Sequence, residues 1–267
     1  MVTKLLFIGA GRMAEAIISG LTEDENNGFT RVTVSNRADT EKLERLKNTY
    51  GVEVSSDWKT EVNKHDAILL ASPPHTHNEL LRQLSGMIEG QFIITVAAGI
   101  DPSYMEARLP DRTPAAWIMP NTGAQIGQSM STFACGNYVE ENHRKILYKI
   151  LSAIGEAEEL PEEQVHDLTA ITGSAPAFLY AFAEALEEAA VSYEVSPDQA
   201  RKLVTHMLKG SASMLEKGES PQTLMQQVAS PGGSTAEGLR VLEKENFGSL
   251  VKKAVKATND HARGGKD

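Results

Sequence analysis

A short apolar run that leads directly into a glycine-rich turn is the feature that most constrains the fold of this chain. Residues 5–8 are followed by Gly9-Ala10-Gly11-Arg12-Met13-Ala14 and then by a helical pattern. This is the G-x-G-x-x-A form of the dinucleotide fingerprint. The first glycine makes the turn, the second lets the backbone approach a pyrophosphate, and the small third residue lets the helix pack on the strand. The residues expected at the dinucleotide are Gly9, Ala10, Gly11, Arg12 and Met13.

The first half of the chain alternates short apolar runs with amphipathic stretches. Strands are predicted at residues 5–8, 32–35, 52–54, 67–71, 92–96, 115–119 and 131–134, and helices at 13–21, 41–50, 78–87, 103–108 and 140–153. Strands that alternate with helices build a parallel sheet covered on both faces. The pattern therefore predicts an α/β fold with a Rossmann-type, doubly wound, mainly parallel sheet.

Beyond about residue 160 the pattern contains helices only. Helical periodicity predicts helices at 177–191, 197–215, 221–228, 236–242 and 247–261. We expect two domains, residues 1–160 for dinucleotide binding and residues 161–267 as an all-α domain. A small helical domain has little core of its own, and its first long helix carries alanines on several faces. We therefore expect a homodimer built mainly from this half, with a higher assembly of dimers left open.

Composition excludes several classes of function. The net charge of -10 argues against a nucleic-acid-binding surface, which needs a basic stripe. No run approaches the roughly 20 apolar residues of a membrane span, and the first residues are too short for a signal peptide. Cys135 is the only cysteine, so no internal disulfide can form, and a reducing, cytoplasmic setting is expected.

The end of the second strand bears on the choice between the two nicotinamide cofactors. NAD enzymes place an acidic residue there for the ribose hydroxyls, whereas this chain has Ser35-Asn36-Arg37, and Asp39 comes late. Arg37 can bind a 2′-phosphate, with Asn36 adding a polar contact, although a solvated loop cation is the alternative. NADPH is the expected cofactor, and NADH is expected to bind more weakly.

Three further segments follow predicted strands and should lie near the cofactor, because ligands of open parallel sheets bind beyond the carboxyl ends of the strands. They are Ala71-Ser72-Pro73-Pro74, Ala97-Ala98-Gly99 and Met119-Pro120-Asn121-Thr122. Asn121 either orients a nicotinamide amide or forms a turn. The residues expected at the cofactor are Ala71, Ser72, Pro73, Ala98 and Asn121.

The segment Ser230-Pro231-Gly232-Gly233-Ser234-Thr235 is a second glycine-rich turn near the end of the chain. Two adjacent glycines free the backbone to bring N–H groups close to a ligand. Ser234 and Thr235 are expected to cap the helix at 236–242, and the start of that helix is suited to a phosphate or a carboxylate. The alternative is an ordinary turn followed by a helix cap.

Four motifs taken together resemble pyrroline-5-carboxylate reductases, and the resemblance covers residues 4 to about 262. They are the fingerprint at Gly9, Met119-Pro120-Asn121-Thr122, Thr172-Gly173-Ser174-Ala175-Pro176-Ala177-Phe178 and the segment from Ser230 to Thr235. The resemblance implies hydride transfer from NADPH to the C=N carbon of a cyclic imino acid, giving L-proline. It also implies a substrate site between the helical domain of one subunit and the nucleotide domain of its partner.

The resemblance also implies roles for single residues. Thr235 is the candidate for hydrogen bonding or proton supply at the ring nitrogen, and Glu162 is a weaker candidate near the substrate. The residues expected to bind the substrate are Ser230, Gly232, Gly233, Ser234 and Glu162. No metal is expected, since His75 and His77 have no accompanying set of ligands.

The chain departs from the family pattern mainly on the cofactor side. Arg12 replaces an amide residue, Pro73 a lysine, Trp117 an arginine and Gly123 a proline. These changes motivate one alternative, a low-activity or regulatory paralogue that binds NADP. Another is a reductase like the β-hydroxyacid dehydrogenases, which would need a catalytic lysine such as Lys202 or Lys209.

Overall fold

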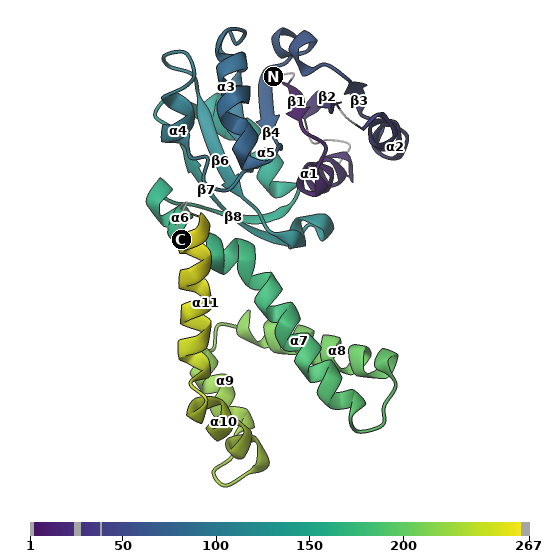
Figure 1. The fold of residues 1–267 in the computed structure, drawn as a ribbon, viewed down its shortest axis with the longest axis vertical. Helices are drawn as coiled ribbons and strands as arrows, with labels where there is room; N and C mark the ends of the chain where they lie inside the picture. Colours follow the sequence, from purple (N-terminus) through teal and green to yellow (C-terminus); the bar gives the residue numbers. More distant parts are fainter. Residues whose placement is uncertain (1–2, 24–27, 38, 263–267) are drawn as a thin grey trace. The chain divides into compact units, whose positions relative to one another are not determined.

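The computed structural model describes residues 3–23, 28–37 and 39–262. The chain forms two compact units, one comprising Met1–Ser174 together with the segment that starts at Asn259, and the other Ala175–Thr258. The first unit therefore extends past residue 160, where the sequence changes character (Figure 1).

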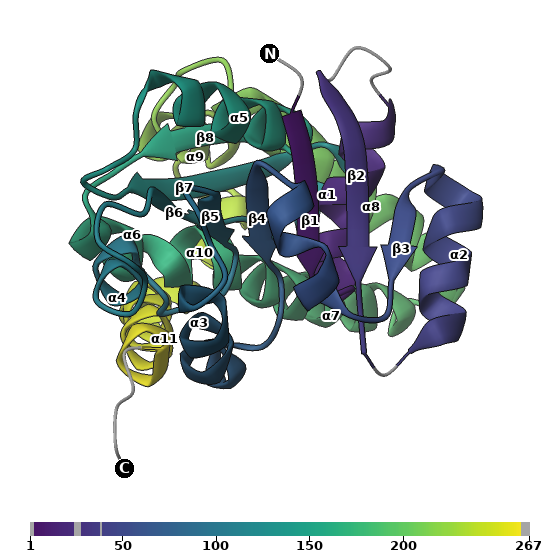
Figure 2. The same cartoon turned by 90° about the horizontal axis from the view of Figure 1, so that it is seen from above.

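The first unit is built on one sheet. Within the described residues the sheet has eight strands in the order β3-β2-β1-β4-β5-β6-β7-β8, which can be followed in Figure 2. All neighbouring strands are parallel except β6 and β7. The strands are β1 (Thr3–Ile8), β2 (Phe29–Ser35), β3 (Glu53–Ser55), β4 (Ala67–Leu70), β5 (Phe92–Thr95), β6 (Ala115–Met119), β7 (Ser129–Cys135) and β8 (Gly155–Glu159).

Helices connect these strands and cover both faces of the sheet. The α-helices of the first unit are α1 (Arg12–Glu23), α2 (Thr40–Tyr50), α3 (His77–Ser85), α4 (Pro102–Glu106), α5 (Glu141–Ser152) and α6 (Glu162–Thr169). The short 3-10 helices are η1 (Trp58–Thr60), η2 (Val62–Lys64), η3 (Pro74–Thr76) and η4 (Thr122–Ile126), and the π-helix η5 spans Ala170–Ser174.

Alternating side chains of the strands supply two hydrophobic cores. On β1, Leu5 and Phe7 pack with α1, α2 and α5, whereas Leu6 and Ile8 pack with α3 and α4. Successive strand residues point to opposite faces, so a strand buried on both faces is mainly apolar. The expected doubly wound, mainly parallel sheet is confirmed.

The sequence did not indicate β8 or α6. β8 has the sequence Gly-Glu-Ala-Glu-Glu, which carries no strand propensity, and it forms because its backbone pairs with β7. Arg144 binds the carboxylate of Glu159 at 2.6 and 2.9 Å and helps to hold this acidic strand. The sequence of α6 is mainly polar, and Val165 is the apolar residue that this helix buries in the core.

Helices are the only regular secondary structure among the described residues of the second unit. It contains α7 (Ala175–Val191), α8 (Pro197–Leu215), α9 (Pro221–Val228), α10 (Ser234–Lys244) and most of α11 (Phe247–Ala262). No side chain of α7, α9, α10 or α11 is buried, and in α8 only Ala200 and Val204 are. No helix within the described residues is long and apolar enough to cross a membrane.

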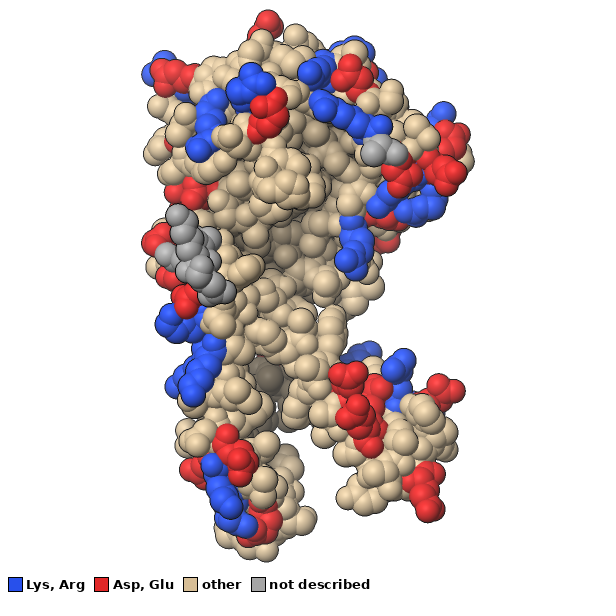
Figure 3. All heavy atoms as spheres, viewed as in Figure 1, with Lys and Arg blue, Asp and Glu red and all other residues tan. Residues whose placement is uncertain are grey.

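Acidic and basic side chains are mixed on the surface. Figure 3 shows both signs of charge on one face, separated by broad areas without charged side chains. Apolar side chains of the helical unit contribute to the exposed surface: Leu179 is 49% exposed, Leu203 61% and Leu250 63%. Such exposure is more than a small monomeric unit normally shows.

Candidate active site

The turn after β1 admits only glycine at its first position. Gly9 has a φ of +110°, and a Cβ there would lie 2.7 Å from the carbonyl carbon and oxygen of Ala71. The turn therefore packs directly against the loop that follows β4. Ala10 is buried, Met13 is half-buried, and Gly11 and Arg12 are exposed at the start of α1.

A hollow of about 390 Å³ lies beside this turn, at the carboxyl ends of β1 and β2 and against α3. Four of the residues expected at the cofactor line it: Gly9, Asn36, Arg37 and Ser72. The sequence did not indicate the other polar and aromatic residues of its lining, which are Trp58, Thr76, Glu79 and Gln83. Trp58 follows β3, which neighbours β2, so only the sheet order brings it to this place.

The polar groups at the end of β2 are arranged for a ligand with negative charge. The hydroxyl of Ser35 is buried and has no hydrogen-bond partner among the described residues. Arg37 is exposed, and its guanidinium carbon lies 5.9 Å from the centre of the Trp58 ring. Asp39 instead caps α2, where its carboxylate accepts a hydrogen bond of 2.8 Å from the Lys42 N–H.

Glu79 is the carboxylate that lines the hollow, and it is already paired. Arg82 donates to both of its oxygens, at 2.8 and 2.6 Å, and these bonds lower the pKa of Glu79 to about 2. Glu79 therefore stays ionised with its charge offset by Arg82.

The loop after β4 is held by its own side chains. The Thr76 hydroxyl lies 2.7 Å from the Pro73 carbonyl oxygen and 3.0 Å from the Ser72 hydroxyl oxygen. His77, which the sequence placed in this loop, instead begins α3 and is fully buried. Its Nδ1 lies 3.2 Å from the Pro73 carbonyl oxygen and its Nε2 2.9 Å from the Thr95 hydroxyl oxygen. Burial lowers the pKa of His77.

The residues described contain no group of three or more histidine, cysteine or acidic side chains placed to hold a metal ion. His75, the other histidine of this region, is exposed. Cys135 is half-buried, and burial raises its pKa to about 12, so its thiol is not activated as a nucleophile.

The loop after β5 is fixed by a tryptophan. The Trp117 indole N–H donates to the Ala97 carbonyl oxygen at 2.9 Å, and Trp117 is fully buried. On its other side the ring meets His166, with ring centroids 4.6 Å apart. Trp117 occupies the position where the resembled family has arginine. The half-buried Ala98 packs against the hydrophobic cluster that contains Trp117.

Asn121 forms a turn. Its side-chain oxygen accepts a hydrogen bond of 2.8 Å from the Gly123 N–H, and its amide nitrogen donates to the Thr172 carbonyl oxygen at 3.0 Å. The same nitrogen lies 3.5 Å from the Met130 carbonyl oxygen. Its side chain therefore ties the loop after β6 to η5, as expected of a turn former.

Glu162 is bound to the first turn of α4 instead of standing free. Its carboxylate accepts hydrogen bonds from the Ser103 N–H at 2.9 Å and the Ser103 hydroxyl at 2.7 Å. One turn further along α6, Nε2 of His166 lies 2.9 Å from the Asp101 carboxylate. These contacts fasten α6 to α4 within the first unit.

The second glycine-rich turn lies in the helical unit and leads into α10. The Gly233 N–H donates to the Ser230 carbonyl oxygen at 2.9 Å, and Gly232 has a φ of +73°. Pro231 and Gly232 thus occupy the two central positions of a turn that needs a positive φ at the second. The expectation that Ser234 and Thr235 cap the helix is wrong, because Gly233 is the N-cap and α10 already begins at Ser234.

A glycine cap supplies no side-chain acceptor, so the first N–H groups of α10 have no side-chain cap. Ser234 and Thr235 are exposed in the first turn of the helix. The backbone N–H groups and these two hydroxyls therefore form one donor-rich surface.

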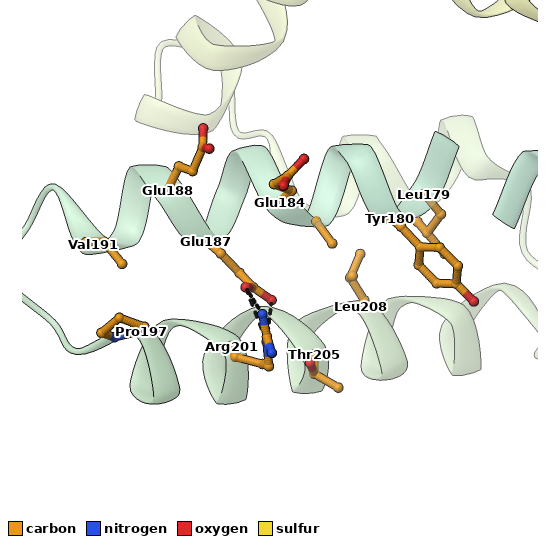
Figure 4. Close-up of a pocket in the computed structure, with 11 residues that line it drawn as sticks. Leu179, Tyr180, Glu184, Glu187, Glu188, Val191, Pro197, Arg201, Thr205 and Leu208 are labelled. Atoms are coloured by element: carbon orange, nitrogen blue, oxygen red, sulfur yellow. Dashed lines mark hydrogen bonds and ion pairs between the residues drawn. The ribbon is translucent and has the colours of Figure 1, made fainter. Parts of the chain in front are cut away.

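A groove of about 730 Å³ in the helical unit is lined by side chains of α7 and α8 (Figure 4). Leu179, Tyr180 and Val191 line it on α7, and Leu208 lines it on α8. Glu187 and Arg201 face one another across it, with an ion pair of 3.2 Å.

A Rossmann-type sheet with a dinucleotide hollow, followed by a helical unit, defines a dinucleotide-dependent oxidoreductase. Residues 4–99 match the family described as NADP oxidoreductase coenzyme F420-dependent. Residues 162–264 match the family described as pyrroline-5-carboxylate reductase dimerisation.

Individual relatives agree with these matches. The chain is 35% identical to pyrroline-5-carboxylate reductase 1 of Bacillus spizizenii, over 95% of this chain and 86% of the relative. It is 30% identical to the pyrroline-5-carboxylate reductase of Staphylococcus aureus, over 97% of this chain and 96% of the relative.

The solved structure of Plasmodium falciparum pyrroline carboxylate reductase with NADP bound superposes with a TM-score of 0.89 at 26% identity, over 99% of this chain and 98% of that one. The pyrroline-5-carboxylate reductase of Coxiella burnetii gives 0.88 at 28% identity, over the whole of both chains. The chain belongs to the pyrroline-5-carboxylate reductase family. Membership of this family excludes the alternative of a reductase like the β-hydroxyacid dehydrogenases.

Proposed function

We propose that this chain uses NADPH to reduce the C=N bond of 1-pyrroline-5-carboxylate to L-proline, the final step of proline biosynthesis. The observation that carries the proposal is the start of α10, where a glycine N-cap leaves backbone N–H groups without a side-chain acceptor. Such a helix start binds a carboxylate, and the substrate of this reaction carries one.

The nucleotide would be held by the turn after β1 and by the hollow beside it. Gly9 and Gly11 let the backbone approach the pyrophosphate, and Ser72 lines the wall formed by the loop after β4. The nicotinamide, when bound, supplies the hydride. Ala98 and Asn121 belong to the loops at the ends of β5 and β6, where that ring would lie.

Arg37 and Asn36 favour NADPH over NADH. They line the hollow at the end of β2, where a 2′-phosphate would lie, and Asp39 is engaged in capping α2. A guanidinium at this position attracts the phosphate, and no carboxylate follows β2 directly to bind the ribose hydroxyls.

Thr235 acts on the ring nitrogen of the substrate. Hydride addition to the carbon of the protonated imine moves the C=N electron pair onto the nitrogen and gives the neutral amine of proline. The exposed Thr235 hydroxyl, in the first turn of α10, donates a hydrogen bond there, and Ser230, Gly232, Gly233 and Ser234 hold the carboxylate. Glu162 contributes by holding α4 and α6 together, because its carboxylate is bound to Ser103.

The protein works as a homodimer. Leu179, Tyr180 and Leu203 are each about half exposed or more, and this unit matches a dimerisation family. A second copy that covers the groove between α7 and α8 would remove this apolar surface from water. Size-exclusion chromatography with light scattering should give a dimer mass, and a monomer at micromolar concentration would contradict this part of the proposal. A reducing cytoplasm is the proposed setting, on the ground of the single cysteine.

The first experiment follows oxidation of NADPH by its absorbance, with 1-pyrroline-5-carboxylate as substrate, and repeats it with NADH. Substrate-dependent oxidation, faster with NADPH, supports the proposal. A folded protein that binds NADPH without turnover would instead identify a regulatory paralogue, and the replacements at Pro73 and Trp117 would be the first positions to revert.

A further inference from the structure

We propose that His77 is a positioning residue that couples the two loops flanking the cofactor, residues 71–74 after β4 and residues 96–99 after β5. This inference rests on the proposed function, because it assumes that the nucleotide binds at those loops. His77 itself does not line the hollow.

The hydrogen bonds of His77 determine its tautomer. A carbonyl oxygen can only accept, so the 3.2 Å contact to Pro73 requires that Nδ1 carry a hydrogen. Burial keeps the ring neutral, so Nε2 is then an acceptor. It receives the Thr95 hydroxyl hydrogen at 2.9 Å in preference to the Leu70 carbonyl oxygen, which lies farther from the same hydroxyl, at 3.4 Å. The Thr95 oxygen in turn accepts from the Ala97 N–H at 3.1 Å.

These bonds form one chain of donors that runs from one loop to the other. Ala97 donates to Thr95, Thr95 donates to His77, and His77 donates to Pro73. The direction of each bond fixes that of the next, which rigidifies a buried polar network when every member is satisfied.

Both ends of this chain of hydrogen bonds are held by further contacts. Ala97 is held from its other side, since its carbonyl oxygen accepts the Trp117 indole N–H at 2.9 Å. At the far end, Pro73 belongs to the loop against which Gly9 packs, and Ser72 of the same loop lines the hollow. A shift of His77 would therefore move the loops after β4 and β5 relative to each other.

A purely structural role would be served better by an apolar residue. His77 is completely buried, and a leucine would fill a similar volume without the cost of removing an imidazole from water. What the histidine adds is a donor to the loop after β4 and an acceptor for the hydroxyl at the end of β5. His75, two residues earlier, is exposed and outside this network, and it provides a matched control.

The test combines binding and kinetics in His77→Leu, His77→Gln and His75→Leu. NADPH dissociation constants are measured by fluorescence titration, which needs no turnover, and KM is then measured for NADPH and for the imine substrate. His77→Leu breaks both links and should raise Kd and KM for NADPH about threefold to tenfold, the usual effect of losing a buried hydrogen bond. KM for the imine should stay within about twofold.

His77→Gln places its amide near the position of Nε2, so its oxygen can accept from Thr95 while the Pro73 carbonyl oxygen loses the Nδ1 donor. This variant should therefore lie between the wild type and His77→Leu. His75→Leu should match the wild type. If His77→Leu does not fold, His77→Gln alone must show the rise in the NADPH dissociation constant.

A lowered melting temperature with wild-type NADPH affinity in both His77 variants would overturn the proposal and leave a structural role. A wild type that binds no NADPH would overturn both proposals, whereas a wild type that binds NADPH without reducing the imine would remove only the proposed function.

Discussion

Removal of the Arg37 guanidinium tests how the chain distinguishes its two cofactors. Arg37 lines the hollow at the end of β2, near the Trp58 ring. In Arg37→Ala a bound 2′-phosphate loses this cation, whereas NADH has no such phosphate and loses nothing. The variant should therefore weaken NADPH and leave NADH almost unchanged.

The exposure of Arg37 sets the size of this effect. A hydrogen bond to a charged group contributes about 1.5–3 kcal/mol, but water and salt screen an exposed pair. Lys59 also lies near the Trp58 ring, 5.7 Å from its centre, and would keep part of the positive potential. We therefore expect a loss of about 1–2 kcal/mol, which raises KM for NADPH roughly fivefold to thirtyfold.

The assay measures kcat/KM for both cofactors at a saturating imine concentration, at low and high salt. Lys59→Ala is the matched control, because it removes a charge from the same ring without lining the hollow. Because Lys59 is a solvated cation outside the lining of the hollow, Lys59→Ala should change KM for NADPH less than twofold. Equal losses of NADPH and NADH in Arg37→Ala would refute the assignment of Arg37 to the 2′-phosphate.

Three further predictions concern the chemistry, the packing and the pH dependence of the protein. Thr235→Ala should lower kcat by about one to two orders of magnitude, with Thr235→Ser retaining most activity, and unchanged kinetics would remove its role. Gly20→Ala should lower the free energy of unfolding by about 2 kcal/mol in urea titrations. The added Cβ would lie 1.9 Å from the carbonyl oxygen of Ala153, the C-cap of α5, and this clash exceeds the gain of about 1 kcal/mol in helix propensity. Gly238→Ala is its control, since nothing lies within 4 Å, and a similar loss there would contradict this explanation. Burial lowers the pKa of His65 and His77 below the usual histidine value of about 6.5, so below that pH the unfolded chain binds protons that the folded one does not. Stability should thus be full above about pH 6.5 and fall by up to about 1.4 kcal/mol per histidine for each pH unit below it, and a flat profile between pH 7.5 and 5 would contradict the burial of both rings.

Most of the fold could be predicted from local patterns. Each run of apolar residues in the first half became a strand, and α8 and α9 begin and end at the predicted residues 197–215 and 221–228. Both helices have strong local signals, because Ser196 and Ser220 cap them and a proline follows each cap. β8 lacks any such signal, since its acidic sequence becomes a strand only through pairing with β7.

The site was predictable where backbone geometry depends on one residue type. Gly9 is an example, since its positive φ and the nearby Ala71 backbone exclude any side chain. Trp58 was not predictable, because the order of the strands brings the end of β3 beside that of β2. The role of Ser234 was also mispredicted, since hydroxyl residues and glycine are both acceptable at an N-cap and only the backbone decides which one occupies it.

The sequence by itself determined the Rossmann unit, the helical unit and the residues at the two glycine-rich turns, because these depend on periodicity and on backbone freedom within a few residues. Only the tertiary structure decided which buried polar groups meet. His77 and Thr95 are eighteen residues apart, and Trp117 lies twenty residues beyond Ala97. The first hydrogen bond depends on how α3 packs on the sheet, and the second on the register of β5 against β6, and neither is encoded within a few residues of the chain.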